Sequence, residues 1–222
     1  MTEPSHSIFD ARADALRLRL LKPWNFKVYL WRKLPLAACA GLSLRQLDAR
    51  GCAVGLPGGW RTQNPFRSTY FAAQAMAAEM STGAPAMILV QGAPASIAMI
   101  LRGMEAVFTK RVQGPSVFRF DDIAGMQAAI ARAAASGESE SYTGTSIGQG
   151  PDGAPASQFR VTWSFKRRSC PSFRPTRSSG SWWRAAAASG WGATRHCCRG
   201  APRRSSITRS RVFAKCAGRC GS

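Results

Sequence analysis

The sequence predicts an α+β fold in which an antiparallel sheet wraps around one long buried helix. The segment 68–85, STYFAAQAMAAEMSTGAP, is apolar almost all round, as a fully buried helix is. Segments typical of strands stand before and after it, with a smaller helical segment among the later ones. The last strand, 158–168, alternates apolar and polar residues, which is the period of a strand with one face on a core.

Two basic and aromatic helices are expected before the first strand. The first covers 8–21 and ends at Pro23, and the second follows in 25–34, NFKVYLWRKL. Their composition could suit a membrane surface. We favour the alternative that they pack over the edge of the domain.

Two short strands and the long helix come next. The segment 42–56 predicts two strands around a tight turn. Asn64, which is followed by proline, is typical of a helix N-cap, and Ser68 is a rival start. Gly83 and Pro85 are typical of the point where a helix stops.

The rest of the sheet follows the long helix. The remaining elements are expected in this order: a long strand at 95–112 with a candidate bulge at Gly103, a strand at 116–120, a helix at 121–137, and strands at 140–148 and 158–168. Asp121 or Asp122 would cap the second helix, and Gly137 would close it.

Charge is divided unevenly along the chain. The 222 residues have a hydrophobic content of 45%, which suits a globular core, and a formal net charge of +20. All 11 acidic residues fall in 1–168, whereas 169–222 contain 11 basic residues and no acidic one. We therefore divide the chain into an N-terminal helical extension at 1–23, a folded domain at 24–168 and a basic low-complexity tail at 169–222.

The tail, 169–222, shows almost no sustained periodicity. One interpretation is a nucleic-acid-binding extension, with arginines on phosphates and tryptophans stacked on bases. Another is a metal site, but the spacing of the candidate ligands matches no strong zinc pattern; these are His196, Cys197, Cys198, Cys216 and Cys220. We favour a frame-shifted segment, or else a disordered basic extension, because GC-rich DNA read out of frame tends to encode this mixture without acidic residues.

Cysteine and histidine limit the compartment and the chemistry. Cys39 and Cys52 give the folded domain no disulfide framework. The first residues are acidic in part and have no early apolar run, so we expect no secretory signal there. The apolar window 85–101 is broken and too short for a bilayer span. We expect a cytoplasmic protein without a membrane span. His6 and His196 lie outside the folded domain, so we expect no Ser-His-Asp, Cys-His or His-rich metal site there, and no cofactor.

Glu79 is an unexpected charge on the long apolar helix. On a wheel with about 100° per residue, Tyr70, Gln74 and Ser81 fall within about 40° and form a polar stripe that could meet solvent or a loop. Glu79 lies about 140° from Gln74. It shares its face with small and apolar residues, namely Ala72, Ala75, Met76 and Gly83.

Glu79 is also the only acidic residue between Asp48 and Glu105. A buried ionised carboxylate is costly, so its site must supply donors, raise its pKa or open to a pocket. All three conditions are common where a carboxylate does chemistry. The alternative is a structural ion pair, for example with Arg102 or Lys110 of the following strand.

The segment 64–83, NPFRSTYFAAQAMAAEMSTG, with the long strand after it and the closing TWSFKRR, resembles an uncharacterised branch of the hotdog thioesterase-like superfamily, a domain of unknown function. The resemblance covers 24–168. It implies a long central helix wrapped by an antiparallel sheet and subunits paired as a homodimer. It also implies hydrolysis of acyl-CoA or acyl-carrier-protein thioesters at the subunit interface.

The same resemblance indicates site residues. Glu79 stands where hotdog enzymes often place a catalytic Asp or Glu, and Asn64 resembles the polar residue of the loop before the helix. Tyr70, Phe71 and Gln74 would contact the substrate. Many hotdog enzymes carry a His-Gly-Gly-like turn near the place of Tyr70 and Phe71. The larger side chains here could close off the backbone amides that would bind a thioester oxygen.

Two function hypotheses follow. In a thioester hydrolase, backbone N–H groups near the start of the helix would polarise the carbonyl, Glu79 would act as general base or nucleophile, and Asn64 would orient the water or the carbonyl. The run Met87–Leu89 and the long strand could line an acyl groove or belong to the ordinary core. In the second hypothesis the domain binds an acyl ligand or serves as a dimeric scaffold. Nucleic-acid binding would rest on the tail alone, and we do not favour it.

Overall fold

The computed structural model describes residues 9–168, so the interpretations of the tail lie outside the described residues. The described chain forms five helices and six strands. In chain order they are α1 (Ala11–Leu21), α2 (Pro23–Lys33), α3 (Pro35–Ala40), β1 (Ser43–Asp48), β2 (Gly51–Leu56), α4 (Phe71–Gly92), β3 (Ile97–Phe108), β4 (Ser116–Phe120), α5 (Ile123–Ser136), β5 (Glu140–Gln149) and β6 (Pro155–Arg167).

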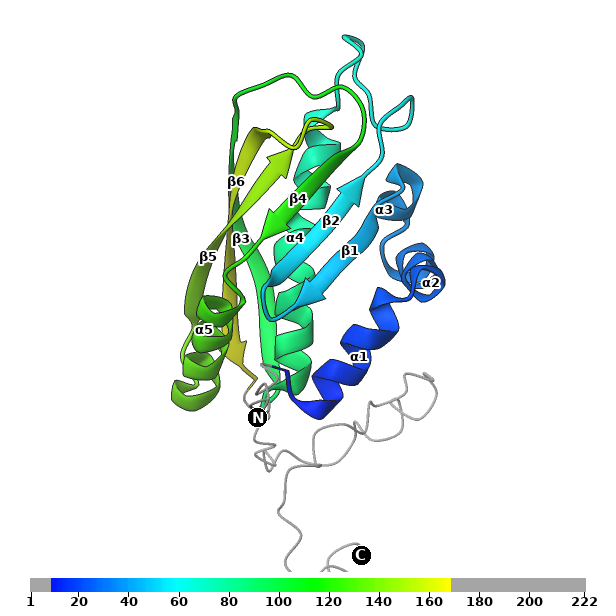
Figure 1. Ribbon diagram of the computed structural model, residues 1–222. Coiled ribbons are helices and arrows are strands. Elements are labelled where there is room, and N and C mark those ends of the chain that lie inside the picture. The colour runs from blue at the N-terminus through cyan, green and yellow to red at the C-terminus, as the bar shows by residue number, and fades with distance from the viewer. Residues whose placement is uncertain (1–8, 169–222) are drawn as a thin grey trace, which may run out of the picture. The chain divides into compact units, whose positions relative to one another are not determined.

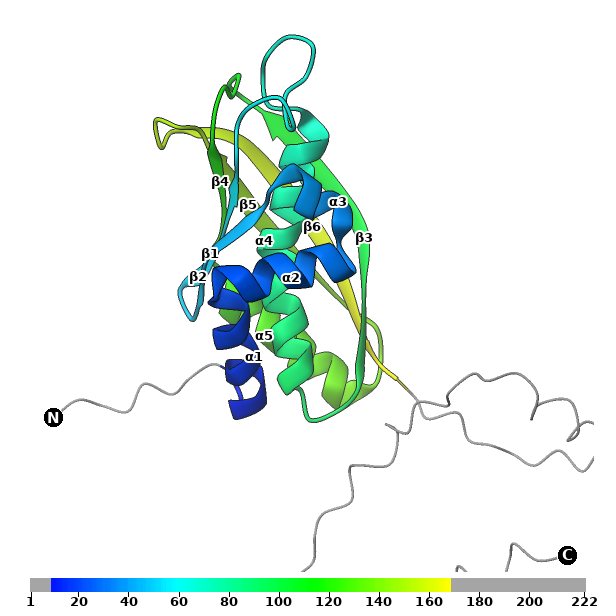
Figure 2. The same cartoon turned by 90° about the vertical axis from the view of Figure 1, so that its right-hand side faces the viewer.

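The six strands form one antiparallel sheet in the order β1-β2-β4-β5-β6-β3. The sheet curves around α4, with β1 and β2 on one side of the helix and β3 on the other (Figures 1 and 2). Side chains of α4 and of the inner sheet face belong to one hydrophobic cluster. The predicted α+β fold, a sheet wrapped around a long helix, is confirmed.

Several details of the prediction are confirmed. The pairing of β3 with β6 shifts register between Leu101 and Gly103, as expected for a bulge. Asp122 caps α5 by accepting a hydrogen bond from the Gly125 N–H at 2.8 Å, and Gly137 closes it in the left-handed conformation (φ 77°). The apolar residues that alternate along β6 are buried, namely Phe159, Val161, Trp163 and Phe165.

α4 begins later than the sequence predicts. Tyr70 is the N-cap and Phe71 the first helical residue, rather than Asn64 or Ser68. Asn64 Oδ1 accepts hydrogen bonds from the backbone N–H groups of Phe66 (3.0 Å) and Ser68 (3.1 Å) and from the Ser68 hydroxyl (3.1 Å). An asparagine used in this way closes a turn, so it is not available to cap the helix.

α4 also ends later than predicted. It runs through Gly83 and Pro85 and stops at Gly92. A proline inside a helix removes one backbone hydrogen bond and favours a break. Here the turn that follows carries Ala86 and Ile88, which are fully buried. Packing of this turn outweighs the lost hydrogen bond, because most helix stability in proteins comes from tertiary contacts.

Two polar side chains of α4 face the sheet. Gln74 Oε1 accepts a hydrogen bond from the Ser157 hydroxyl at 3.0 Å, and the hydroxyls of Ser81 and Ser146 bond each other at 2.8 Å. Contact of the polar stripe with solvent is therefore wrong for Gln74 and Ser81, whereas Tyr70 is exposed. A helical wheel gives the angles between side chains but not the direction of the core, and here the sheet supplies hydroxyl partners.

The N-terminal helices pack on α4. Pro23 both follows α1 and opens α2, where its missing N–H would have no helical partner. Phe26 and Leu30 of α2 are buried in the same cluster as α4, and α2 passes across α4 (Figure 2). The sequence does not predict α3, a short helix that Pro35 begins and Gly41 ends in the left-handed conformation (φ 79°).

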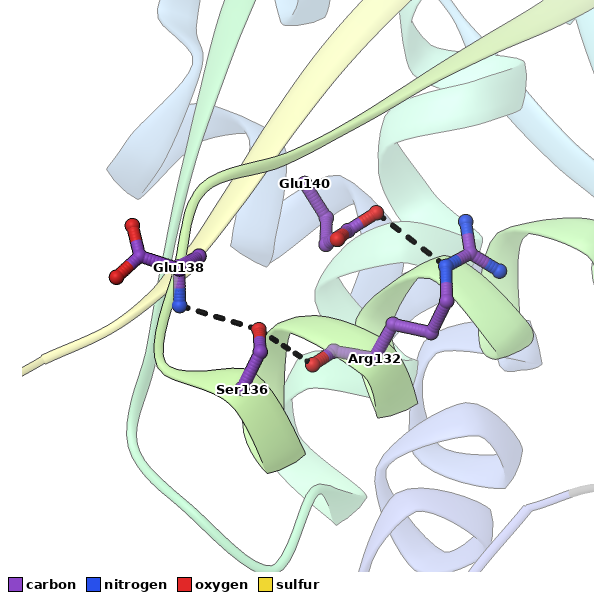
Figure 3. A network of polar contacts seen from close by, with 4 residues as sticks. All are labelled: Arg132, Ser136, Glu138 and Glu140. Atoms are coloured by element: carbon purple, nitrogen blue, oxygen red, sulfur yellow. Dashed lines mark hydrogen bonds and ion pairs between the residues drawn. The ribbon is translucent and has the colours of Figure 1, made fainter.

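The passage from α5 to β5 is held by polar contacts (Figure 3). The Ser136 hydroxyl donates to the Arg132 carbonyl at 2.9 Å and accepts from the Glu138 N–H at 3.1 Å. Arg132 Nε pairs with Glu140 Oε2 at 3.3 Å. These contacts satisfy the last turn of α5 and set the start of β5.

Candidate functional site

A wide cavity of about 560 Å³ lies at the N-terminal end of α4. The loop before α4, its first turns, the end of β3 and the loop after β3 line it. Four of the five predicted site residues line this cavity, namely Asn64, Tyr70, Phe71 and Gln74. Lys110 and Arg111 line it as well, so its wall is cationic.

Asn64 and Gln74 use most of their polar groups inside the protein. Asn64 Oδ1 closes a turn with Phe66 and Ser68 in the loop before α4. Asn64 Nδ2 donates to no partner within residues 9–168. Gln74 Nε2 donates to the Thr69 carbonyl at 3.2 Å, and its Oε1 accepts from Ser157. Asn64 Nδ2 is therefore the donor that these two side chains leave for a ligand.

The first turn of α4 begins at this cavity, which Tyr70 and Phe71 line. The N–H of Tyr70 donates to the Thr62 carbonyl at 2.7 Å, and that of Ala73 donates to the Tyr70 carbonyl at 3.0 Å. In the described part of the chain, the N–H groups of Phe71 and Ala72 have no backbone acceptor and no side chain caps the helix. The positive end of the helix dipole is thus left without a partner charge.

Tyr70 and Phe71 form an aromatic pair beside these N–H groups. Their rings meet edge to face with centroids 4.8 Å apart, and both side chains are exposed. Such a pair offers a ligand an apolar surface with a hydroxyl at its edge.

Glu79 lies in a second, more enclosed cavity of about 250 Å³, here called the Glu79 chamber. It is the only acidic side chain in the lining, and almost all of its neighbours are apolar or aromatic. They include Phe26, Tyr29, Met80, Met87, Met99 and Trp163. Met87 and Met99 come from the two segments that the sequence indicates as a possible acyl groove.

The Glu79 carboxylate forms no ion pair within residues 9–168. The alternative of an ion pair with Arg102 or Lys110 is wrong, because Arg102 lies on the exposed part of β3 and Lys110 lines the other cavity. Burial raises the pKa of the Glu79 carboxyl. Burial, and secondarily the charge of Glu79, raises the pKa of Tyr29, whose hydroxyl donates to Met87 Sδ at 3.3 Å.

The carboxylate points toward the C-terminal half of α4. A Cβ at Gly83 would lie 3.0 Å from Glu79 Oε1 and 3.1 Å from Trp163 Cζ2, so glycine leaves room for both groups. Trp163 Nε1 donates to Thr82 Oγ1 at 2.9 Å, which fixes the indole. Sequence reasoning missed Trp163 and Tyr29 as neighbours of Glu79. The alternation in β6 shows that Trp163 faces the core but not which turn of α4 it meets.

The five predicted site residues thus fall into two cavities. Glu79 follows Phe71 by eight residues, which is about 12 Å along a helix. The half-exposed face between them carries Ala72, Ala75 and Met76. The structure gathers Asn64, Tyr70, Phe71 and Gln74 at the helix start and keeps Glu79 apart.

Solved structures share this architecture. A protein of unknown function from Pseudomonas aeruginosa, named as a probable thioesterase, aligns with 17% identity and a TM-score of 0.55 over 66% of this chain and 97% of that one. The chain is a hotdog-fold protein. A protein of unknown function from Chlorobaculum tepidum aligns at 12% identity, with a TM-score of 0.56 and coverage of 67% and 98%. A thioesterase from Haemophilus influenzae aligns at 12% identity, with a TM-score of 0.50 and coverage of 66% and 91%.

A family model also matches this hotdog protein. The model is described as a domain of unknown function (DUF4442), and it matches residues 22–122. No curated protein matches. The expected resemblance to an uncharacterised branch of the thioesterase-like hotdog proteins is confirmed, and the likeness to the solved structures concerns the fold.

Proposed function

We propose that this hotdog protein hydrolyses acyl thioesters and that Glu79 supplies the carboxylate of the reaction. The observation that carries the proposal is the Glu79 chamber, in which one carboxylate with a raised pKa and no ion-pair partner in the described chain faces an apolar cavity. A raised pKa makes a carboxylate a stronger base toward water than an ordinary surface carboxylate. An apolar chamber beside it suits an acyl chain.

The start of α4 would supply the hydrogen-bond donors that act on the thioester carbonyl. The N–H groups of Phe71 and Ala72 would donate to the thioester oxygen and stabilise the charge that develops on it. Asn64 Nδ2 would orient the carbonyl or the attacking water. Glu79 must turn toward the helix start, the usual direction of helical side chains. Ala72 and Ala75 are small enough to leave this face of α4 open.

The attack then proceeds on water activated by Glu79. The carboxylate takes one proton, the water oxygen forms a bond to the carbonyl carbon, and the C–S bond breaks. The proton passes to the departing thiolate, so that a carboxylic acid and a thiol leave and Glu79 regains its charge.

The cations around the first cavity suit an anionic carrier. Lys110 and Arg111 would face phosphates of coenzyme A or of the prosthetic group of an acyl-carrier protein. Both carriers occur in the cytoplasm. The free thiols of Cys39 and Cys52 agree with a reducing compartment, and we propose a cytoplasmic location.

We also propose that two chains pair through β3. This edge strand bonds β6 on one side and no other strand within residues 9–168. Ile100 and Val107 are exposed on it. Antiparallel self-pairing of β3 about a two-fold axis near its bulge would set Ile100 beside Val107 of the second copy.

The test of the function is hydrolysis of a panel of acyl-CoA chain lengths by Glu79→Gln. We expect kcat/KM to fall by about 100-fold or more, because the amide cannot accept a proton from water. Glu138→Gln is the matched control, since Glu138 is an exposed carboxylate after α5 that lines neither cavity. Unchanged hydrolysis by Glu79→Gln, with the fold intact by circular dichroism, would remove Glu79 from the mechanism.

A non-catalytic acyl-binding module is the second candidate. The observation that favours it is the orientation of the Glu79 carboxylate, which lies beside Gly83 and away from the start of α4. In that case the wild-type protein binds a fatty acid or an acyl-CoA in the chamber and hydrolyses none of the panel.

A further inference from the structure

α2 has two apolar faces, and only one of them is buried. Phe26 and Leu30 point into the hydrophobic cluster. Trp24, Val28 and Trp31 stand on the opposite side, at positions i, i+4 and i+7, and have exposed fractions of 75%, 39% and 61%. We call these three residues the outer stripe of α2. Two tryptophans in one exposed stripe are unusual for a helix whose packing is already satisfied on the other side.

Basic residues flank the outer stripe. Lys27 and Arg32 stand on its two sides at about 60° and 80° from Trp24 on the wheel, and both are exposed. Lys22 and Lys33 stand just before and at the end of the helix and are exposed as well. The sequence has no acidic residue between Asp14 and Asp48. The surface around the outer stripe therefore joins apolar rings to positive charge.

The next segment continues this surface along the chain. Leu34 follows α2 and Leu36 belongs to α3, and both are exposed. Arg19 of α1, just before α2, is exposed and basic. Figure 1 shows α2 and α3 on the right-hand side of the domain and β5 on the left.

We propose that the outer stripe of α2 docks this protein on the surface of an anionic lipid bilayer. Tryptophan rings lie at the boundary between headgroups and acyl chains, where their apolar body and their N–H group both find partners. Lysine and arginine next to them gain about 1 kcal/mol each near anionic headgroups. Among residues 9–168 no helix has the length and hydropathy to cross a bilayer, so α2 would lie in the plane of the interface.

Charge favours a bilayer over a second copy of the chain as the occupant. A self-pairing of the outer stripe would bring Lys27 and Arg32 of two copies together without an acidic partner, which is repulsive. An anionic bilayer avoids this repulsion, because its headgroups attract the basic residues while its apolar interior receives the exposed rings. The proposal is independent of catalysis, although α2 also lends Phe26 and Tyr29 to the wall of the Glu79 chamber.

The test is co-sedimentation of the full chain with vesicles of phosphatidylcholine alone and of phosphatidylcholine with phosphatidylserine. We expect binding to the anionic vesicles that weakens with salt. Trp24→Ser/Trp31→Ser should weaken this binding at least tenfold, roughly the loss of one well-buried apolar side chain. Lys27→Gln/Arg32→Gln should weaken it about 30-fold, from two contacts of about 1 kcal/mol each.

Trp60→Ser is the matched control, because Trp60 is the most exposed tryptophan of the described residues (82%) and lies outside α2. This variant should bind like the wild type. Equal binding by the Trp24→Ser/Trp31→Ser variant would overturn the proposal and assign any membrane binding to the basic residues of 169–222. A change of the oligomeric state of that variant in light scattering, without a change in vesicle binding, would instead assign the outer stripe to a second copy.

Discussion

At the scale of a single residue, burial changes the acid–base properties of the Glu79 carboxyl. Its carboxylate has no ion-pair partner in the described chain, and desolvation raises its pKa. The charged form is therefore held at a cost in folding free energy. Each unit of upward shift corresponds to about 1.4 kcal/mol. Such groups are common where a carboxylate does chemistry, which agrees with the role that we propose for Glu79.

This cost predicts a pH dependence of stability. Below the ordinary carboxyl pKa of about 4.3, Glu79 is neutral in both the folded and the unfolded chain and costs nothing. As the pH rises through the raised pKa of the folded state, the unfolded chain loses its proton first and the folded state loses relative stability. Glu79→Gln should therefore raise the free energy of unfolding at pH 7 relative to the wild type, with the gain disappearing near pH 4.

Urea unfolding at a series of pH values measures this difference. Glu138→Gln serves as the control, because Glu138 is exposed and forms no ion pair within residues 9–168. A Glu79→Gln variant that is less stable than the wild type at pH 7 would show that the carboxylate makes a stabilising contact.

α4 is the element on which the fold and the site both depend. Its polar side chains fix the helix on the sheet through Gln74 with Ser157, Ser81 with Ser146, and Thr82 with Trp163. The buried hydroxyls leave no freedom of rotation, because turning the helix would leave each of them without a partner. This orientation directs Glu79 toward α2 and the Glu79 chamber.

The pair of serines gives a test of this role. Ser81→Ala leaves the fully buried Ser146 hydroxyl without its partner and should cost about 1–2 kcal/mol of unfolding free energy. Ser81→Ala/Ser146→Ala removes both polar groups and should recover much of that loss. A double-mutant cycle by urea unfolding measures the coupling. Additive losses would show that the two hydroxyls do not stabilise each other.

At the scale of the whole molecule, the edge strand β3 still lacks a partner on one side in the described chain. β3 is long and exposes Ile100, Leu101, Val107 and Phe108 along an edge that has no strand beside it in the described chain. Proteins protect such an edge or use it, since it otherwise pairs with any other strand. β3 carries a bulge, but no proline blocks it. The proposed self-pairing as a homodimer would satisfy this edge.

Charge placed at that edge tests the dimer. Ile100→Asp/Val107→Asp should convert the protein from twice the chain mass of 23.9 kDa to a single chain in light scattering, because the proposed pairing sets these positions beside each other. Both side chains are exposed, so the chain itself should still fold. Trp60→Asp is the control for adding charge to an exposed apolar position. A wild-type protein that is already a single chain would contradict the pairing.

The candidate site was only partly predictable from the residues. The sequence identifies Glu79 as an isolated acid on an apolar helix, and the structure agrees with two of the conditions it predicts, a raised pKa and an opening to a pocket. It cannot show that Asn64 closes a loop or that Gln74 bonds Ser157, because both depend on neighbours distant in the chain. Tyr29 enters the chamber from α2 by the same kind of distant contact.

By itself the sequence determined the order of helices and strands apart from α3, the alternation of β6 and the bulge at Gly103, because these depend on local periodicity and on backbone freedom. Tertiary structure alone decided that α4 continues past Pro85 and which way its polar side chains point. A local sequence pattern shows that a proline weakens the helix, and it gives the angles between side chains around the helix axis. The pattern does not show how much packing free energy offsets the effect of the proline. It also does not show where the sheet lies, and the sheet sets which side of the helix faces the core.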